Sequence, residues 1–171
     1  MSGNHKINNT ILSWAGPHGL PNYSQIEDAD FGDALRAGFA ENLAEIEAIG
    51  SNPESPTFEN TIDALEVAGE TLSRAASLFF TKAGNHTNDT IQALEREFAP
   101  EFARHSGEIA KNKKLFERVD ALWETRETLG LTAEQHQVLK KTHRGFVRMG
   151  AALEGEAQAR LIAINERLAT L

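Results

Sequence analysis

Residues 52–80 decide the fold of this chain: the stretch begins Asn-Pro-Glu-Ser-Pro-Thr-Phe-Glu-Asn-Thr-Ile and ends Ser-Leu-Phe-Phe. Pro53 and Pro56 are unsuited to a helix interior, because each lacks an N–H donor and its ring clashes with the preceding turn. The hydroxyl of Thr57 can then cap a helix by accepting a backbone N–H of the first turn. Behind this cap, apolar or small residues recur at alternating steps of four and three, which predicts one amphipathic helix. This stripe consists of Phe58, Ile62, Leu65, Gly69, Leu72, Ala76 and Phe79.

The predicted helix ends near Ala83 or Gly84, and the small residues Gly69 and Ala76 within its stripe would allow a second helix to approach closely. Similar periodic patterns predict further helices on both sides of it. One is expected from Asp28 or Asp30 to Gly50, and another from the turn at 85–89 to the basic junction at 111–114, with a kink or break at Pro100. A third is expected from Leu115 to the left-handed cap Gly130, and a fourth from the capping box Thr132–Gln135 to near Gly150. The last is expected from about Glu154 through Leu168 and Leu171.

No segment alternates apolar and polar residues with a period of two. The sequence therefore predicts an all-α protein, an antiparallel array of about five or six helices joined by short turns. Residues 1–27 are interrupted by Gly, Pro and Asn and are predicted to form an irregular N-terminal arm, whereas residues 28–171 are predicted to form one helical domain. The apolar residues expected to anchor the arm are Trp14, Leu20, Tyr23 and Ile26.

Composition excludes several classes of function. The chain has 171 residues, of which 40% are apolar, and this is enough for a folded core. Its formal charge of −8 argues against a nucleic-acid backbone or an anionic membrane as the main partner. It contains no cysteine, which excludes disulfides and thiolate zinc sites. The apolar run at 11–15 is too short for a signal sequence or a membrane span, and we expect a cytoplasmic protein.

The six histidines include no His-Glu-x-x-His motif, in which two imidazoles four residues apart face one zinc ion. His136 and His143 share a helix face but lie two turns apart, so an exposed or capping role is expected for them. Glu101 and His105 have the spacing of two metal ligands, but no further ligand is identifiable, and we expect a pair on the helix surface. The sequence also lacks a Gly-x-Ser-x-Gly nucleophile motif and a phosphate-binding loop. We therefore predict no catalytic, cofactor-binding or metal-binding residue in this chain.

Several short segments carry a resemblance to a known family. They are the stretch at 52–62 quoted above, Ala-Leu-Glu at 64–66, Phe-Phe at 79–80, His-Thr-Asn-Asp at 86–89, Leu-Phe-Glu-Arg-Val-Asp-Ala-Leu-Trp at 115–123, Leu-Gly-Leu at 129–131, Phe-Val-Arg-x-Gly-Ala-x-Leu at 146–153 and Asn-Glu-x-Leu-Ala-Thr-Leu at 165–171. In their order and spacing they resemble the thimet-oligopeptidase-type zinc metallopeptidases. They are most similar to the bacterial peptidyl-dipeptidases (dipeptidyl carboxypeptidases), with oligopeptidase A as a close relative. The resemblance covers nearly the whole chain and is weakest before Asn22.

This resemblance implies a larger helical enzyme whose two halves enclose a narrow channel for short peptides. In such an enzyme zinc is bound by a His-Glu-x-x-His motif and a third carboxylate, all far downstream, and it activates water. By resemblance this chain is an N-terminal segment of the channel wall, inactive alone, with zinc present only in the full-length parent. That parent is expected to cleave short peptides and to release C-terminal dipeptides. The alternative is a free-standing helical module that binds a protein partner.

The apolar stripe of the last predicted helix continues to the final residue, which is the pattern expected of a truncated chain. The partner would then be the missing C-terminal catalytic portion of the same protein. Apolar surface that this portion would cover is expected to make the isolated chain self-associate.

Overall fold

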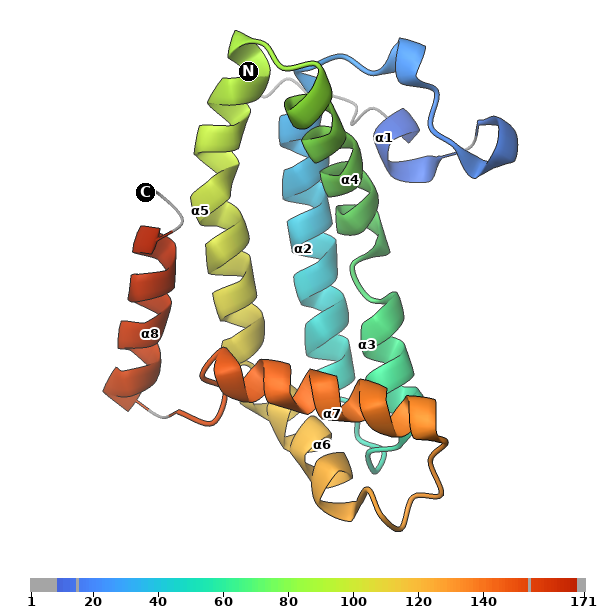
Figure 1. Cartoon of the computed structure of the whole chain (residues 1–171), viewed down its shortest axis with the longest axis vertical. Coiled ribbons are helices and arrows are strands. Elements are labelled where there is room, and N and C mark those ends of the chain that lie inside the picture. Colours follow the sequence, from blue (N-terminus) through green and yellow to red (C-terminus); the bar gives the residue numbers. More distant parts are fainter. Residues whose placement is uncertain (1–8, 15, 154, 169–171) are drawn as a thin grey trace. The chain divides into compact units, whose positions relative to one another are not determined.

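The computed structural model describes residues 9–14, 16–153 and 155–168, which form helices joined by turns (Figure 1). The helices are α1 Asn9–Ser13, α2 Asp30–Gly50, α3 Ala64–Val67, α4 Glu70–Asn85, α5 Asp89–Lys111, α6 Lys113–Thr125, α7 Ala133–Arg148 and α8 Gly155–Leu168. Pro17–Gly19 and Tyr23–Gln25 form 3₁₀ turns, and Phe58–Asp63 forms a π-helix. No strand occurs in the described residues, so the all-α prediction is confirmed. The antiparallel arrangement stays a prediction.

The predicted helix starts at Thr57 and Thr132 are both confirmed as capping boxes. Thr57 Oγ1 accepts the Asn60 backbone N–H at 3.1 Å, and Asn60 Oδ1 accepts the Thr57 N–H at 2.8 Å. Thr132 forms the same reciprocal pair with Gln135, at 3.2 and 3.0 Å. Each box satisfies two backbone donors that have no partner within the first helical turn.

The single helix predicted behind Thr57 is wrong, because the chain breaks at Ala68 and Gly69. The π-helix leads directly into α3, Ala68 is extended, and Gly69 has a left-handed φ of 80° before α4 begins. A Cβ atom at Gly69 would lie 2.8 Å from Asn42 Nδ2. Glycine is therefore required there for two reasons, the left-handed backbone and the close neighbour. Stripe spacing alone does not reveal such a break, since the apolar positions on both sides keep the helical period.

Three other local predictions need correction. Helix α5 continues through Pro100, so the break predicted there as one alternative does not occur, whereas the kink stays a prediction. Helix α6 ends at Thr125 instead of near Leu129, and residues 126–130 form turns that close on Gly130 with a φ of 66°. In the arm, Leu20 and Tyr23 are exposed and Ile11 of α1 is the fully buried anchor. The predicted helix start at Glu154, and Leu171, lie outside the described residues.

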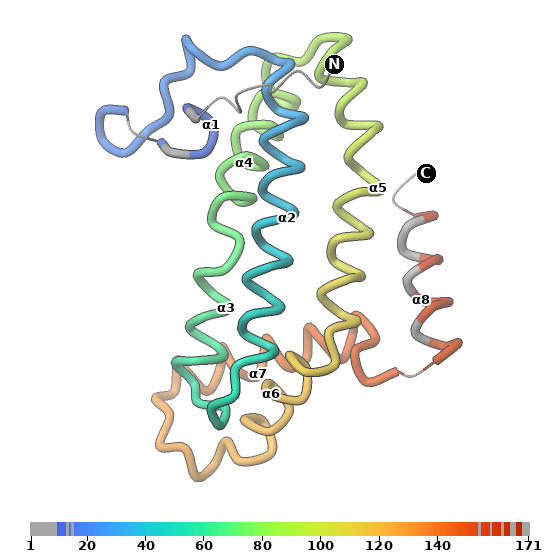
Figure 2. Tube along the Cα trace, turned by 180° about the vertical axis from the view of Figure 1, so that it is seen from behind, coloured from blue at the N-terminus to red at the C-terminus, as the bar shows by residue number. Residues whose placement is uncertain are grey.

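The chain divides into two compact units, each built from two stretches of sequence. Unit 1 comprises Met1–Asn42 and Gly69–Phe98, and unit 2 comprises Leu43–Ala68 and Ala99–Leu171. Helices α2 and α5 each contribute one part to unit 1 and the other part to unit 2. Figure 2 shows the course of both helices along the chain trace. The single domain predicted for residues 28–171 stays a prediction.

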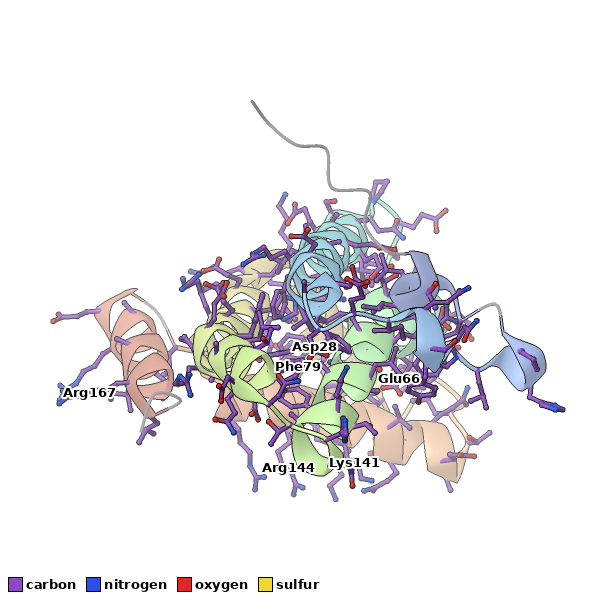
Figure 3. All side chains as sticks on the ribbon, turned by 90° about the horizontal axis from the view of Figure 1, so that it is seen from above. Asp28, Glu66, Phe79, Lys141, Arg144 and Arg167 are labelled. Carbon is purple, nitrogen blue, oxygen red and sulfur yellow. The ribbon has the colours of Figure 1, made fainter. Side chains whose placement is uncertain are left out.

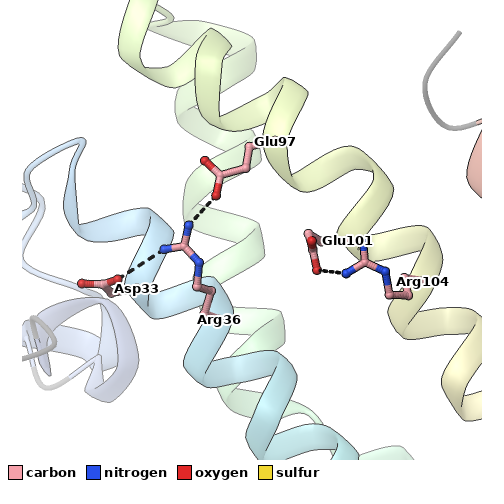
Figure 4. A network of polar contacts seen from close by, with 5 residues as sticks. All are labelled: Asp33, Arg36, Glu97, Glu101 and Arg104. Atoms are coloured by element: carbon pink, nitrogen blue, oxygen red, sulfur yellow. Dashed lines mark hydrogen bonds and ion pairs between the residues drawn. The ribbon is translucent and has the colours of Figure 1, made fainter.

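The core of unit 1 is rich in aromatic side chains from α2, α4 and α5. Its large buried residues are Ile11, Phe31, Leu35, Leu78, Phe79, Ile91 and Phe98. Helix α1 packs against α4, where the Arg74 guanidinium donates to the Leu12 carbonyl at 3.4 Å. The Arg36 guanidinium lies over the Phe98 ring, 5.2 Å from its centroid. Arg36 also forms ion pairs with Asp33 and Glu97, which Figure 4 shows. An apolar core edged by ion pairs is thus shared between helices that are distant in sequence.

The core of unit 2 joins the π-helix to α6 and α7, which pack against each other. Its buried members are Ile46, Phe58, Ile62, Leu115, Val119, Leu122, Leu139, Phe146 and Ala151. Asn112 Oδ1 caps α6 by accepting the Leu115 N–H at 3.0 Å. Helix α8 follows a turn at Gly150, where an added Cβ would lie 2.5 Å from Leu161 Cδ2. The apolar stripe predicted around Phe58 and Ile62 therefore does form a core, but with α6 and α7 as its partners.

Candidate binding pocket

The two histidines singled out in the sequence both contact Trp123 of α6. His143 stacks on the indole with ring centroids 5.0 Å apart and planes 11° apart, and His136 meets it edge-on at 6.4 Å. His143 Nε2 lies 3.0 Å from Asp120 Oδ1, and the His136 ring lies 3.6 Å from a Glu127 carboxylate oxygen. The shared helix face was predicted correctly, but the exposed or capping role expected for His143 is wrong, because its ring is half-buried between aromatic groups.

Four side chains form a continuous stack along α6 and α7. The Arg126 guanidinium lies 4.1 Å from the Trp123 centroid, His143 stacks on Trp123, and Phe116 stacks on His143 at 6.0 Å. Stacked rings and cation–π contacts stabilise such an interface beyond its apolar area. The signal in the sequence was the seven-residue spacing of Phe116 and Trp123, matched by that of the two histidines on α7. The stack therefore joins the two helices.

Glu101 and His105 of α5 were predicted to form a pair on the helix surface, and this prediction is wrong. Glu101 Oε2 accepts from the Arg104 guanidinium at 2.8 Å (Figure 4), whereas His105 is only 8% exposed. Burial lowers the pKa of the His105 imidazole below its ordinary value, because the charged form loses solvation. Within residues 9–14, 16–153 and 155–168, no group of three or more His, Asp or Glu side chains is placed to hold a metal ion.

A pocket of about 300 Å³ opens in unit 1 between the second 3₁₀ turn and the C-terminal half of α4. Its apolar walls come from three elements: Tyr23 and Ile26 from the arm, Phe31 from α2 and Leu78 from α4. Phe31 and Leu78 are buried, while the Tyr23 ring is 61% exposed at the edge. The polar groups of the mouth come from the last two turns of α4 and the residue after it; they are Thr81, Lys82, Asn85 and His86.

A polar network around Asp28 holds the arm beside α4 and the start of α5. Asp28 forms an ion pair with Lys82 and accepts from Asn88 Nδ2 at 2.6 Å, and Figure 3 labels Asp28 together with Phe79 of the same unit. Asn88 Oδ1 also caps α5 by accepting the Ile91 N–H at 3.0 Å.

The hydrogen bonds from Lys82 and then Asn88 lower the pKa of the Asp28 carboxyl, despite an opposing contribution from burial. The stability that Asp28 supplies is complete above its unfolded-state pKa of about 3.9 and is lost as the pH falls through its lower folded-state pKa.

Sequence reasoning predicted no site residue and so did not find this pocket. Its walls combine residues 23–31 with residues 78–86, two stretches that are joined only by tertiary packing. The sequence signals beside it were Phe31 and the polar turn at 85–89 that follows α4. The structure adds the pocket, which no pattern within either stretch indicates.

Arg118 is a second feature that the sequence analysis missed. Its side chain occupies a position among the buried stripe residues Leu115, Val119 and Leu122 and is itself only 6% exposed. It donates to the carbonyls of Asn52 and Glu54 at 3.0 and 2.8 Å and to Asn60 Oδ1 at 2.7 Å. Arg118 therefore fixes the proline-rich loop before the π-helix and is a structural residue. Lys141 and Arg144, by contrast, are exposed on α7 (Figure 3).

Comparison with known proteins finds two similar sequences. The chain is 41% identical over 155 residues to the dipeptidyl carboxypeptidase of Escherichia coli (strain K12), a match that covers 91% of this chain and 23% of that relative. It is 40% identical over 171 residues to the dipeptidyl carboxypeptidase of Salmonella typhimurium (strain LT2), covering 100% of this chain and 25% of the relative. No family model matches the chain.

None of the helices in the described part of the chain is long and apolar enough to span a membrane. The chain spans about a quarter of the length of the curated relatives it matches. Its identity to both of them extends over nearly all of its own residues. The resemblance to the peptidyl-dipeptidases is therefore confirmed, since nearly the whole chain is similar in sequence to part of each dipeptidyl carboxypeptidase.

Proposed function

We propose that this chain is an N-terminal, non-catalytic helical segment of a zinc-dependent peptidyl-dipeptidase, where it forms part of the wall around the peptide channel. The observation that carries the proposal is the 40–41% identity to two dipeptidyl carboxypeptidases over at least 91% of the chain. The all-helical structure of the described residues supports it. The parent protein would release dipeptides from the C-termini of short peptides in the cytoplasm.

The chemistry of this proposal requires residues outside the chain. The 171-residue sequence contains no His-Glu-x-x-His motif and no cysteine, so its residues do not supply the ligands of a peptidase zinc site. In the parent, zinc would polarise the scissile carbonyl and activate water at ligands from the remaining portion. We therefore expect the chain alone to be inactive, with that remaining portion as its partner.

The decisive experiment determines the length of the source reading frame and assays its product on a short peptide with a free C-terminus. A longer frame that encodes His-Glu-x-x-His, with dipeptide release that a chelator abolishes and zinc restores, is the expected result. The 171-residue chain assayed in parallel should release no dipeptide. Chelator-sensitive release by this chain alone would refute the non-catalytic role.

A chimera provides a more direct test of the wall assignment. In it, the matching quarter of the Escherichia coli relative is replaced by this chain, and release of C-terminal dipeptides is compared with that of the relative itself. Retained activity is expected, and a folded but inactive chimera would count against the proposal. A reading frame that ends at Leu171 would instead favour the alternative, a helical module that binds a protein partner.

A further inference from the structure

We propose that the pocket in unit 1 binds one neutral apolar side chain of a peptide, with a phenyl ring or a branched aliphatic group as the preferred occupant. That this peptide is a substrate of the parent enzyme rests on the proposed function. The pocket itself is defined by Ile26, Phe31 and Leu78 as apolar walls, with Thr81 and Lys82 at its mouth.

The size of the pocket is sufficient for an apolar side chain. The cavity of about 300 Å³ lies at the lower end of the range for ligand-binding pockets, about 300–1,000 Å³. A dry cavity of about 150 Å³ lined by aliphatic and aromatic side chains is enough to bind benzene. A phenyl or isobutyl group with the adjoining backbone therefore fits.

Charge limits the occupant to a neutral group. The cationic side chain at the mouth, Lys82, forms an ion pair with Asp28, so the two charges largely cancel where a ligand would enter. The network also holds Asp28 through Asn88, which keeps the carboxylate in place. A glutamate or lysine side chain would lose water in the pocket without gaining a counter-charge, and that loss is costly.

The mouth of the pocket offers groups that suit a peptide backbone. Thr81, Asn85 and His86 are exposed there and carry a hydroxyl, an amide and an imidazole. Groups of this kind donate to and accept from amides, whereas the interior walls offer only apolar contact. The exposed ring of Tyr23 adds an amphipathic edge, typical of sites that are apolar at one end and wet at the other.

The test is an NMR titration of the isotope-labelled 171-residue chain with capped single amino acids. The probes are N-acetyl-phenylalaninamide and N-acetyl-leucinamide, with the alanine, glutamate and lysine analogues as comparisons. We expect the phenylalanine and leucine probes, at low millimolar concentrations, to shift the methyl signals of Ile26 and Leu78 and the amides of Thr81 and Asn85. The other three probes should shift none of them.

Thr81→Trp would fill the mouth of the pocket from an exposed helix position, so the variant should fold. It is expected to weaken binding of the phenylalanine probe by about tenfold or more. The matched control is Ser73→Trp, an exposed position on the same helix outside the pocket, which should leave binding unchanged.

Three results would overturn the proposal: no shift with any probe, equal shifts with the charged or alanine probes, or binding that survives Thr81→Trp. The titration uses no enzymatic readout. Its failure therefore leaves the peptidase assignment standing, and failure of the chelator assay leaves the pocket standing without a role in substrate binding.

Discussion

Buried polar side chains explain features of this chain that its apolar pattern does not. Arg118 uses two guanidinium nitrogens to bind three oxygen acceptors of the proline-rich loop and the π-helix. The rigid fork of an arginine suits such a set of acceptors, whereas a lysine offers a single nitrogen. A loop with two prolines and few backbone donors is thus held by one side chain of α6.

Replacing Arg118 with Met should lower the free energy of unfolding by about 2 kcal/mol, because hydrogen bonds from a charged donor are lost and the loop carbonyls lose their partner. Arg118→Lys should recover only part of this loss. Urea titrations monitored by circular dichroism would measure both. The control is Arg104→Met, which removes an exposed ion pair and should cost under about 1 kcal/mol. Equal losses for the two Met variants would contradict the role assigned to Arg118.

The buried imidazole of His105 predicts a pH dependence of stability. Its pKa is lowered by burial, so the unfolded chain binds the proton more readily than the folded chain. Stability should therefore decrease as the pH falls through the ordinary histidine pKa of about 6.5, and the decrease should level off below the lower folded-state pKa. Urea titrations at several pH values between about 8 and 5 would measure this dependence of the free energy of unfolding on pH.

The variant His105→Gln should flatten this slope, because glutamine does not titrate. His136→Gln, at the more exposed histidine of α7, provides the comparison and should leave most of the slope in place. If the slope of His105→Gln equals that of the unmodified chain, burial of His105 does not cause the pH dependence.

At the scale of the elements, close helix contact depends on glycines that the stripe pattern did not identify. The approach of α2 to α4 occurs at Gly38, where an added Cβ would lie 2.7 Å from Leu72 Cα. The contact atom belongs to the backbone, so a side-chain movement cannot relieve the clash. A close approach does occur at Gly69, as predicted. Gly69 lies in a turn and not within a helix, however, and its close neighbour is the Asn42 side chain.

Gly38→Ala should therefore destabilise the chain by about 1–3 kcal/mol through overpacking. Gly145→Ala is the matched control, since Gly145 lies inside α7 with no atom within 4 Å of the added Cβ. It should stabilise the chain by about 1 kcal/mol, the difference in helix propensity. Chemical denaturation would measure the change in the free energy of unfolding for both variants, and the two changes should have opposite signs. If Gly38→Ala leaves this free energy unchanged, α2 and α4 can separate without cost.

At the scale of the whole molecule, the chain exposes large apolar side chains on α8. On α8, Ile164 is 46% exposed and Leu168 is 61% exposed, although both belong to the apolar stripe of that helix. Exposed apolar faces of this kind promote association between copies. The proposed parent would instead cover them with its remaining portion.

We therefore expect the isolated chain to form dimers or larger species as its concentration rises. Sedimentation velocity or light scattering over a wide concentration range would detect them. The double variant Ile164→Glu with Leu168→Glu should shift the population towards monomer, and Lys141→Glu on the exposed face of α7 serves as a control for added negative charge. A clean monomer at high concentration would refute the prediction.

The sequence by itself determined what depends on near neighbours in the chain. The N-cap at Thr57, the capping box at Thr132, the helix ends at Gly50 and Lys111, and the absence of strands from the described residues follow from patterns within a few residues. The resemblance to the dipeptidyl carboxypeptidases was also readable, since the short segments keep their order and spacing. Local hydrogen bonds and helical periods are encoded in such short stretches, so no tertiary information was needed.

Only the tertiary structure decided the features that join distant stretches. Apolar residues keep the helical spacing on both sides of the left-handed break at Gly69, so periodicity could not distinguish two helices from one. The loop contacts of Arg118, the ring stack at His143 and the pocket between Phe31 and Leu78 each join residues 20 or more positions apart, as in the separation of Trp123 from His143. Such contacts depend on how the helices pack, and the identity of each residue along the chain does not specify that packing.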